Sequence, residues 1–332
     1  MELNKLTLED FVSLVDIMWL DTVDNADRSA YNSGIFHIVP IAQNTGDSRR
    51  MSEIHREQYA RRKPEGDQSE RLKIQKGYQK DLESFRIALD VGVTYEQKTQ
   101  NKYTEVMAQL TDMVDTPWNR MELDLQMFLS NFDQTSYMDM DGETVDLSTG
   151  DTFAWGYSLH PVKASSETYR NILANNPRVS PGSLVAMQRL VSENSIDQFG
   201  TKIVGINYDI LWTTDDAEDL KVVEEFLTSV GSVEYDNPQV KNVNRFKYKH
   251  VVLPRVALTA GGVVDTDKRH YWGLVSTKFV TAYLGIWETP HVIPFFDKKD
   301  GTDNMETGVR AGYGACVVSG RGASFSKGDG SA

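Results

Sequence analysis

Histidines, clustered carboxylates and glycine-rich turns are the parts of this chain whose residue types could carry chemistry. The histidines show neither HExxH nor HxH spacing, and they lie far apart at positions 37, 55, 160, 250, 270 and 291. Scattered single histidines do not form the close ligand set that a metal ion needs. The stretch Asp139-Met-Asp141-Gly142 starts like a calcium-binding loop, but it lacks the third aspartate and the glutamate at position twelve. The sequence therefore predicts a plain turn there and no metal site.

The glycines near the C-terminus and one acidic cluster also fit structural roles. Gly312 and Gly314 lie in GVRAGYGACVVSGRG, which departs from GxGxxG and does not open a helix, so it is not expected to bind phosphate. Four acidic residues mark the start of a predicted helix, where they favour the helix dipole: Asp215, Asp216, Glu218 and Asp219. No GxSxG, Walker or Cys-His arrangement occurs. We therefore expect no catalytic residues, no metal ligands and no cofactor.

Charge and composition narrow the class of protein. The chain has 332 residues, a formal net charge of −13 and 40% hydrophobic residues, which is typical of a folded soluble protein of about two domains. An acidic balance argues against a general nucleic-acid binder. Cys316, the single cysteine, is expected to be a buried small hydrophobe. The N-terminus predicts an amphipathic helix capped by Thr7, not a signal peptide, and no apolar run approaches the ~20 residues of a membrane span.

One segment reverses the overall charge. Residues 46–80 hold ten Lys and Arg residues against six acids, a local charge of +4, with few aliphatic side chains. A nucleic-acid patch, a disordered linker and an arm that reaches a neighbouring subunit are the three interpretations. The candidate contact residues of such an arm are Arg49, Arg50, Arg56, Arg61, Arg62 and Lys63.

Two predicted strands flank this basic segment. The first covers residues 35–41, and Pro40, which cannot donate to a ladder, places it at a sheet edge. The second covers residues 85–95, where apolar and polar residues alternate. We expect that these two strands can pair, with the long excursion leaving and returning between them.

A long helix and an α/β module follow. Apolar residues keep helical phase from Tyr103 to Phe128, and Pro117 lies either in one kinked helix or at the start of a second helix after Thr116. Helices beginning at Ser180 and Asp215 alternate with strands, the second ending before Gly231, and one strand covers 202–212. Residues 309–318 predict a strand on which the long helix packs, with Gly312, Gly314 and Ala315 allowing close approach. The remaining C-terminal residues predict a polar tail.

This order of elements resembles tailed-phage major capsid proteins of the Hong Kong 97 type. The most specific local similarity lies in residues 196–232, where Asp-x-x-Gly leads into a strand, then Asp-x-Leu and an acidic-capped helix. The matching positions are Asp197, Gly200, Ile203, Asp209, Leu211, Glu218, Leu227 and Ser229. The chain departs from the family at Trp212-Thr213-Thr214, where prolines are common.

The resemblance implies an α+β fold of the Hong Kong 97 type. Its expected parts are an N-terminal arm, an extended β-hairpin loop, a peripheral domain with a long spine helix and an α/β axial domain. The corresponding ranges are 1–34 for the arm, 35–94 for the loop, 95–160 with 288–332 for the peripheral domain, and 161–287 for the axial domain.

The resemblance also implies a function: a major capsid (head) protein and not an enzyme. It would assemble with itself, as hexamers and pentamers, into an icosahedral shell that encloses double-stranded DNA without sequence-specific binding. Further expected partners are a separate scaffolding protein, a portal and decoration proteins, with assembly in the host cytoplasm, a virion location and no membrane. The basic segment would lie on an acidic neighbour, because removing its +4 leaves −17 for the rest of the chain. A soluble α/β enzyme with a dispersed active site, a nucleic-acid-binding module and an encapsulin-like nanocompartment shell protein are the alternatives.

Overall fold

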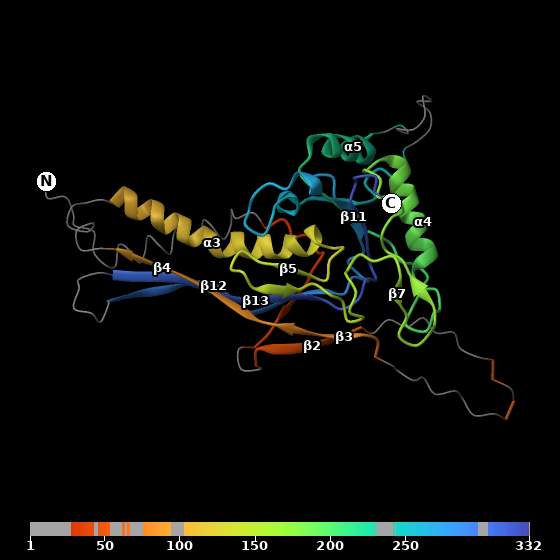
Figure 1. Cartoon of the computed structure of the whole chain (residues 1–332), viewed down its shortest axis with the longest axis horizontal. Coiled ribbons are helices and arrows are strands. Elements are labelled where there is room, and N and C mark those ends of the chain that lie inside the picture. The colour runs from red at the N-terminus through yellow and green to blue at the C-terminus, as the bar shows by residue number, and fades with distance from the viewer. Residues whose placement is uncertain are drawn as a thin grey trace.

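The structure of the protein is a computed structural model, shown in Figure 1. It describes residues 28–42, 46–53, 62–63, 65–66, 76–93, 103–229, 231, 242, 244–297 and 305–331. The predicted N-terminal helix lies outside these residues. Within the described part, no helix is both long enough and apolar enough to cross a membrane.

A long four-stranded sheet forms one half of the molecule, with the order β1-β12-β13-β4. Its strands are β1 (His37–Pro40), β12 (Ala282–Asp297), β13 (Met305–Val317) and β4 (Phe85–Val93). The predicted strands at 35–41 and 85–95 are confirmed as β1 and β4, and Pro40 does lie on an edge strand. The expectation that these two strands pair is wrong. They lie at opposite edges, because the long antiparallel pair β12 and β13 fills the space between them.

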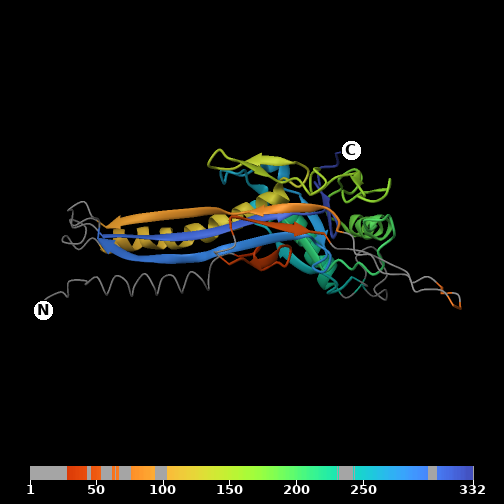
Figure 2. The same ribbon diagram turned by 90° about the horizontal axis from the view of Figure 1, so that it is seen from below.

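Helix α3 (Tyr103–Ser130) is the predicted long helix, and it continues through Pro117 as a single element of 28 residues. The neighbouring Thr116 hydroxyl donates to the carbonyl oxygen of Asp112 at 2.7 Å. Figures 1 and 2 show the helix running along one face of the long sheet. Its buried stripe packs on alternate residues of β13, and the two sets are Trp118, Met121, Leu125 and Phe128 on the helix and Ala311, Tyr313 and Val317 on the strand.

The glycines of β13 do not have the predicted partner. Side chains alternate between the faces of a strand, and Ala315 packs on the core beneath α3 while Gly314 faces the other way. A Cβ atom on Gly314 would lie 1.9 Å from the backbone oxygen of Glu83, where β3 (Gln79–Glu83) meets β4. Gly314 therefore allows the neighbouring strand, and not the helix, to approach.

A second sheet has the order β10-β9-β11-β14 and is covered on one face by two helices. The strands are β9 (Ile210–Thr213), β10 (Lys249–Val252), β11 (Trp272–Val275) and β14 (Ala323–Ser326), and the helices are α4 (Pro181–Asn194) and α5 (Ala217–Thr228). The strand predicted at 202–212 is much shorter in the structure, where β9 begins only at Ile210. The predicted polar tail is also wrong: it contains the buried strand β14, whose Phe325 packs against Phe132, Trp155 and Trp212.

Local capping partly follows the predictions for the two helices. Ser180 caps α4 through a reciprocal pair with Ser183, as expected. Helix α5 is capped by Asp216 and not by Asp215, because the Asp216 carboxylate accepts from the amides of Glu218 and Asp219. The helix ends before Gly231, as expected, since its last residue is Thr228 and Ser229 has extended backbone.

The remaining elements are short, and the two halves of the molecule share a core. These elements are β2 (Ser48–Ser52), β5 (Ser136–Met138), β6 (Thr144–Asp146), β7 (His160–Pro161), β8 (Thr168–Tyr169) and the 3₁₀ turns η2 (Pro254–Ala257) and η3 (Thr266–Lys268). One cluster of buried side chains joins Tyr313 of the long sheet, Phe128 of α3 and Trp212 of the second sheet. Strand β12 runs through the expected domain boundary between 287 and 288, and β14 pairs in the second sheet.

Candidate intersubunit interface

The basic segment begins and ends as a two-stranded hairpin. Strand β2 pairs antiparallel with β3, and Arg50 lies opposite Asp81. The Arg50 guanidinium makes two hydrogen bonds to the Asp81 carboxylate, at 2.7 and 2.9 Å, and these bonds lower the pKa of Asp81. Both side chains remain largely exposed, so this ion pair contributes little to stability.

The structure separates the six predicted contact residues. Arg49 and Arg50 lie on β2, next to the body of the protein. Arg62 and Lys63 are exposed, and their short segment lies far from both sheets, at the lower right of Figure 1. Arg56 and Arg61 lie outside the described residues. Of the four that the structure describes, Arg62 and Lys63 are therefore the two that lie away from both sheets.

The base of this hairpin is part of the protein core. Leu82 on β3 is fully buried in a small cluster with Ile41, Trp287, Cys316 and Val318. The Trp287 indole nitrogen also donates to the carbonyl oxygen of Gly46 at 2.9 Å. Both strands of this hairpin are therefore part of the monomer fold.

A buried ion pair lies next to the end of β2, where the chain leaves this strand for the loop. Glu53 is 1% exposed, and its carboxylate contacts the guanidinium of Arg321, which is 5% exposed. Ser319 donates to the same carboxylate oxygen at 3.0 Å. On the returning strand, the Lys80 ammonium bonds the Ser148 carbonyl and the Asp146 carboxylate. These contacts hold the hairpin base on residues 146–148 and 319–321.

A second buried polar pair lies beside the first. The His160 ring is fully buried, with Nδ1 at 2.8 Å from the Asp151 carboxylate and Nε2 at 3.1 Å from the Trp155 carbonyl. Burial opposes ionisation of Asp151, but the hydrogen bond from His160 lowers the pKa of this carboxyl. The His160 ring stacks on Tyr169, and Arg321 lies over that same tyrosine. The two pairs thus form one continuous polar junction.

An acidic groove of about 500 Å³ lies between β3, β4, α3 and the β5–β6 hairpin. Seven acidic residues line it: Asp81, Glu83, Asp124, Asp139, Asp141, Glu143 and Asp146. Only three basic residues line it, namely Lys80, Arg86 and Arg120. The groove also exposes apolar side chains of β4, among them Phe85, which is 40% exposed. A groove with this surplus of carboxylates attracts a cationic segment.

Arg120 organises the acids at the rim of this groove. Its guanidinium bonds Asp124 at 3.0 Å, Asp139 at 3.0 Å and Asp141 at 2.9 Å, so one cation serves three carboxylates. Burial raises the pKa of Asp124, while hydrogen bonds from Tyr313 and Arg120 act in the opposite direction. Two negative charges of this group therefore remain uncompensated by Arg120.

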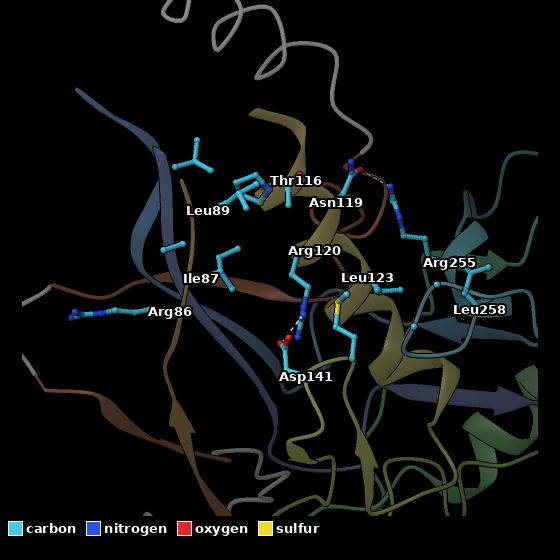
Figure 3. Close-up of a pocket in the computed structure, with 16 residues that line it drawn as sticks. Arg86, Ile87, Leu89, Thr116, Asn119, Arg120, Leu123, Asp141, Arg255 and Leu258 are labelled. Atoms are coloured by element: carbon cyan, nitrogen blue, oxygen red, sulfur yellow. Dashed lines mark hydrogen bonds and ion pairs between the residues drawn. The ribbon is translucent and has the colours of Figure 1, made fainter. Parts of the chain in front are cut away.

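A larger groove of about 730 Å³ lies on the other side of Arg120, between α3 and β4. Figure 3 shows Arg120 reaching Asp141 on one side, and Asn119 bonded to Arg255 across its upper end. Arg86 points away from α3 in the same view. Leu89, 40% exposed, leaves part of the β4 side of this groove apolar and open.

The residues tested for chemistry occupy structural positions. Asp139 accepts from the amides of its own turn, as a plain turn requires. Cys316 is buried, as predicted, and burial raises the pKa of its thiol to about 12. Within the described residues, one group could hold a metal ion, formed by Asp216, Asp219 and His270. Arg269 already pairs with Asp216 at 2.8 Å, which reduces the charge available to a cation.

Sequence reasoning missed the polar junction. Glu53 falls in the basic segment and Arg321 in the predicted tail, and 268 positions separate them. No spacing motif joins such distant residues. Asp197 and Gly200, two positions of the similar stretch 196–232, lie in one tight turn. The Asp197 carboxylate accepts there from two backbone amides at 2.8 Å.

The chain resembles known proteins in structure and not in sequence. No family model and no curated protein matches the chain. The capsid asymmetric unit of cyanophage Pam1 aligns over 90% of this chain and 92% of that chain, with 11% identity and a TM-score of 0.51. A virus-like particle from Pyrococcus furiosus is 9% identical, covering 95% and 99% of the two chains with a TM-score of 0.48. The capsid of an empty GTA particle is 10% identical, covering 90% and 89% with a TM-score of 0.49.

At identities this low, a structural match establishes the fold and not the function. The cyanophage capsid carries the assignment, because its TM-score lies above 0.5 and the match includes nearly all of both chains. The long helix on a sheet, the hairpin that leaves it and the second sheet with two helices agree with the order of elements seen in the sequence. The chain therefore has the fold of tailed-phage major capsid proteins of the Hong Kong 97 type.

Proposed function

We propose that this chain is the major capsid protein of a tailed phage, and that it assembles with itself into an icosahedral shell around double-stranded DNA. The observation that carries the proposal is a charge match between two surfaces of one chain. Exposed Arg62 and Lys63 lie at a distance from the body, and a groove lined by seven acids and three bases lies on the body. One copy therefore offers both halves of a contact that a second copy can complete.

The expected domains and partners follow from the same proposal. The extended loop, the peripheral domain with α3 as its spine and the axial domain with the second sheet would be the units that meet their counterparts in hexamers and pentamers. A scaffolding protein, a portal and decoration proteins would be separate chains. A structural subunit of this kind needs no catalytic group and no cofactor. It would reside in the virion after assembly in the host cytoplasm.

Charge reversal in the loop tests the proposed contact. The double variant Arg62→Glu/Lys63→Glu should slow shell formation at least tenfold, measured by light scattering and counted by negative-stain microscopy. The matched control is Arg189→Glu/Lys202→Glu, which changes the charge equally on residues outside both grooves. The control should assemble like the wild type, and wild-type assembly should weaken as salt shortens the Debye length to ~10 Å at 0.1 M.

A charge swap identifies the surface that receives the loop. Glu83 and Glu143 are exposed and line the acidic groove. Adding Glu83→Lys/Glu143→Lys to the loop reversal should restore assembly, since the two surfaces again have opposite charge. If closed shells never form from the wild type, the capsid proposal fails. Equal assembly by the loop variant would reject the charge contact, and salt-sensitive DNA binding by the dispersed subunit would instead favour a nucleic-acid-binding module.

A further inference from the structure

We propose that the buried Glu53–Arg321 ion pair is a positioning contact, which fixes the direction in which the extended loop leaves the body of the subunit. The inference rests on the proposed function, in which that loop must meet a neighbouring copy. It concerns the loop neck, which we define as Glu53 and Gly77, the two residues between which the chain leaves and returns.

The loop neck is closed by backbone and side-chain contacts. The Glu53 amide donates to the Tyr78 carbonyl at 3.0 Å, and the Gly77 amide donates to the Glu53 carbonyl at 2.9 Å. These bonds extend the β2–β3 ladder up to the last described residue of the outgoing strand. A Cβ atom on Gly77 would lie 2.8 Å from the Glu53 carboxylate, so a larger residue here would displace that side chain.

Arg321 connects the loop neck to distant parts of the chain. Its Nη1 contacts the Glu53 carboxylate, and its Nε donates to the Ile196 carbonyl at 2.6 Å. Its guanidinium also lies 4.7 Å from the ring centroid of Tyr169. Lys163 adds a bond from its ammonium to the Gly77 carbonyl at 2.8 Å. The loop neck is therefore held against three separate segments, around residues 163–169, 196 and 319–321.

The buried ion pair is better suited to orienting the loop neck than to stabilising the fold. Both side chains are at least 95% buried, and removing two charges from water offsets most of their mutual attraction. Within the described residues, Glu53 Oε2 and Arg321 Nη2 have no hydrogen-bond partner, so the pair is incompletely satisfied. An apolar pair of similar volume could fill this space as stably. What it could not supply is the directional contact from Arg321 to both Glu53 and Ile196.

Three variants separate orientation from stability. Glu53→Met and Arg321→Met each leave one buried charge without its partner, so each should unfold at a clearly lower temperature than the wild type. The double variant Glu53→Met/Arg321→Met removes both charges, so its melting temperature should return most of the way to that of the wild type. If the double variant does not fold, Arg321→Lys, which keeps the positive charge but not the fork geometry, provides the comparison.

Loop direction is measured on dispersed full-length subunits. Spin labels at Lys63→Cys and Arg189→Cys report the distance between the loop and α4, while the native Cys316 is buried and does not compete. The wild type should give one narrow distance distribution. The double variant should give a distribution at least twice as wide, and shells should form at least tenfold more slowly despite the recovered melting temperature.

The outcomes are distinguishable. A folded double variant with the wild-type distance distribution and the wild-type assembly rate would overturn the positioning role, and the pair would then be structural only. If the wild type forms no shells but its distribution widens in the double variant, the capsid proposal fails while the positioning contact stands. If the wild type forms shells and the distribution stays unchanged in the double variant, the capsid proposal stands while the positioning contact fails.

Discussion

The phenolic hydroxyl of Tyr313 on β13 donates a 2.6 Å hydrogen bond to the carboxylate of Asp124 on α3. This bond joins α3 to the long sheet inside a largely buried site that also contains Arg120. Tyr313→Phe removes the donor and leaves the buried carboxylate with one partner fewer. The free energy of unfolding at pH 7 should fall by ~1–3 kcal/mol, measured by urea denaturation.

The same variant should show a defined pH dependence. Burial raises the pKa of Asp124 above its unfolded value, and the Tyr313 bond opposes that rise. A folded-state pKa above the unfolded one means that stability is lost as pH rises through the range between the two values. Tyr313→Phe should raise the folded pKa further, so its cost should shrink as pH is lowered below the unfolded value of ~3.9. A cost that is equal at pH 3.5 and pH 7 would contradict this account.

A substitution at Leu125 tests how α3 packs on the core. This side chain is 1% exposed and lies in the core between α3, β13 and the second sheet. Leu125→Ala should lower the free energy of unfolding by ~2–5 kcal/mol, since it removes buried methylenes and leaves a cavity. Leu159, which is 58% exposed, is the matched control, and Leu159→Ala should change stability by less than ~0.5 kcal/mol. Leu110 belongs to the same apolar stripe of the sequence, but its side chain lies outside the described residues.

Gly314 and Gly312 give a paired test of backbone approach. A Cβ atom at Gly314 would lie 1.9 Å from the Glu83 carbonyl oxygen, whereas one at Gly312 would meet its nearest neighbour at 3.3 Å. Gly314→Ala should therefore destabilise the protein by ~1–3 kcal/mol or more through overpacking. Gly312→Ala should cost clearly less. Thermal unfolding of the two variants side by side measures the difference, and equal melting temperatures would show that the β3–β4 backbone yields.

Cys316 should resist thiol reagents in the native protein. Burial raises its pKa to about 12, so almost no thiolate forms at pH 8. The raised pKa also means that the thiol contributes stability below its unfolded pKa of ~8.5, which is lost as pH rises toward the folded value. Ellman's reagent at pH 8 should react with less than ~5% of the thiol in native protein and with all of it in urea. Rapid labelling of folded subunits would show that β13 opens near its end.

Short-range patterns predicted the elements that local chemistry decides. The 3.6-residue phase of α3, the alternation in β4 and the serine cap of α4 act within one turn or one strand, and all three are present. Asp215 and Asp216 are adjacent acids of equal capping propensity, and backbone geometry alone selects the second.

Sequence patterns do not predict which strands pair when the partners lie far apart in the chain. The strands at 35–41 and 85–95 are near each other in sequence. Each of them nevertheless pairs with a longer strand that lies much later in the chain. The C-terminal residues look polar because Ser324 and Ser326 alternate with Phe325 in β14, and only the second sheet makes that pattern a buried strand. The polar junction also depends on tertiary structure, and the six basic residues were predicted as one surface although the hairpin places them at different distances from the body.

Strand β1 is synthesised long before its parallel partner β12. The His37 ring contacts the Val280 carbonyl, which lies 243 positions later in the chain. At ~5–20 residues per second, the ribosome needs roughly 12–50 s to make that partner. During this interval Ile41, which is buried beside Trp287 in the finished protein and whose amide donates to the Ile286 carbonyl, lacks both of these neighbours. The long sheet therefore closes late, and a newly made chain exposes apolar residues next to β1 until β12 has been synthesised.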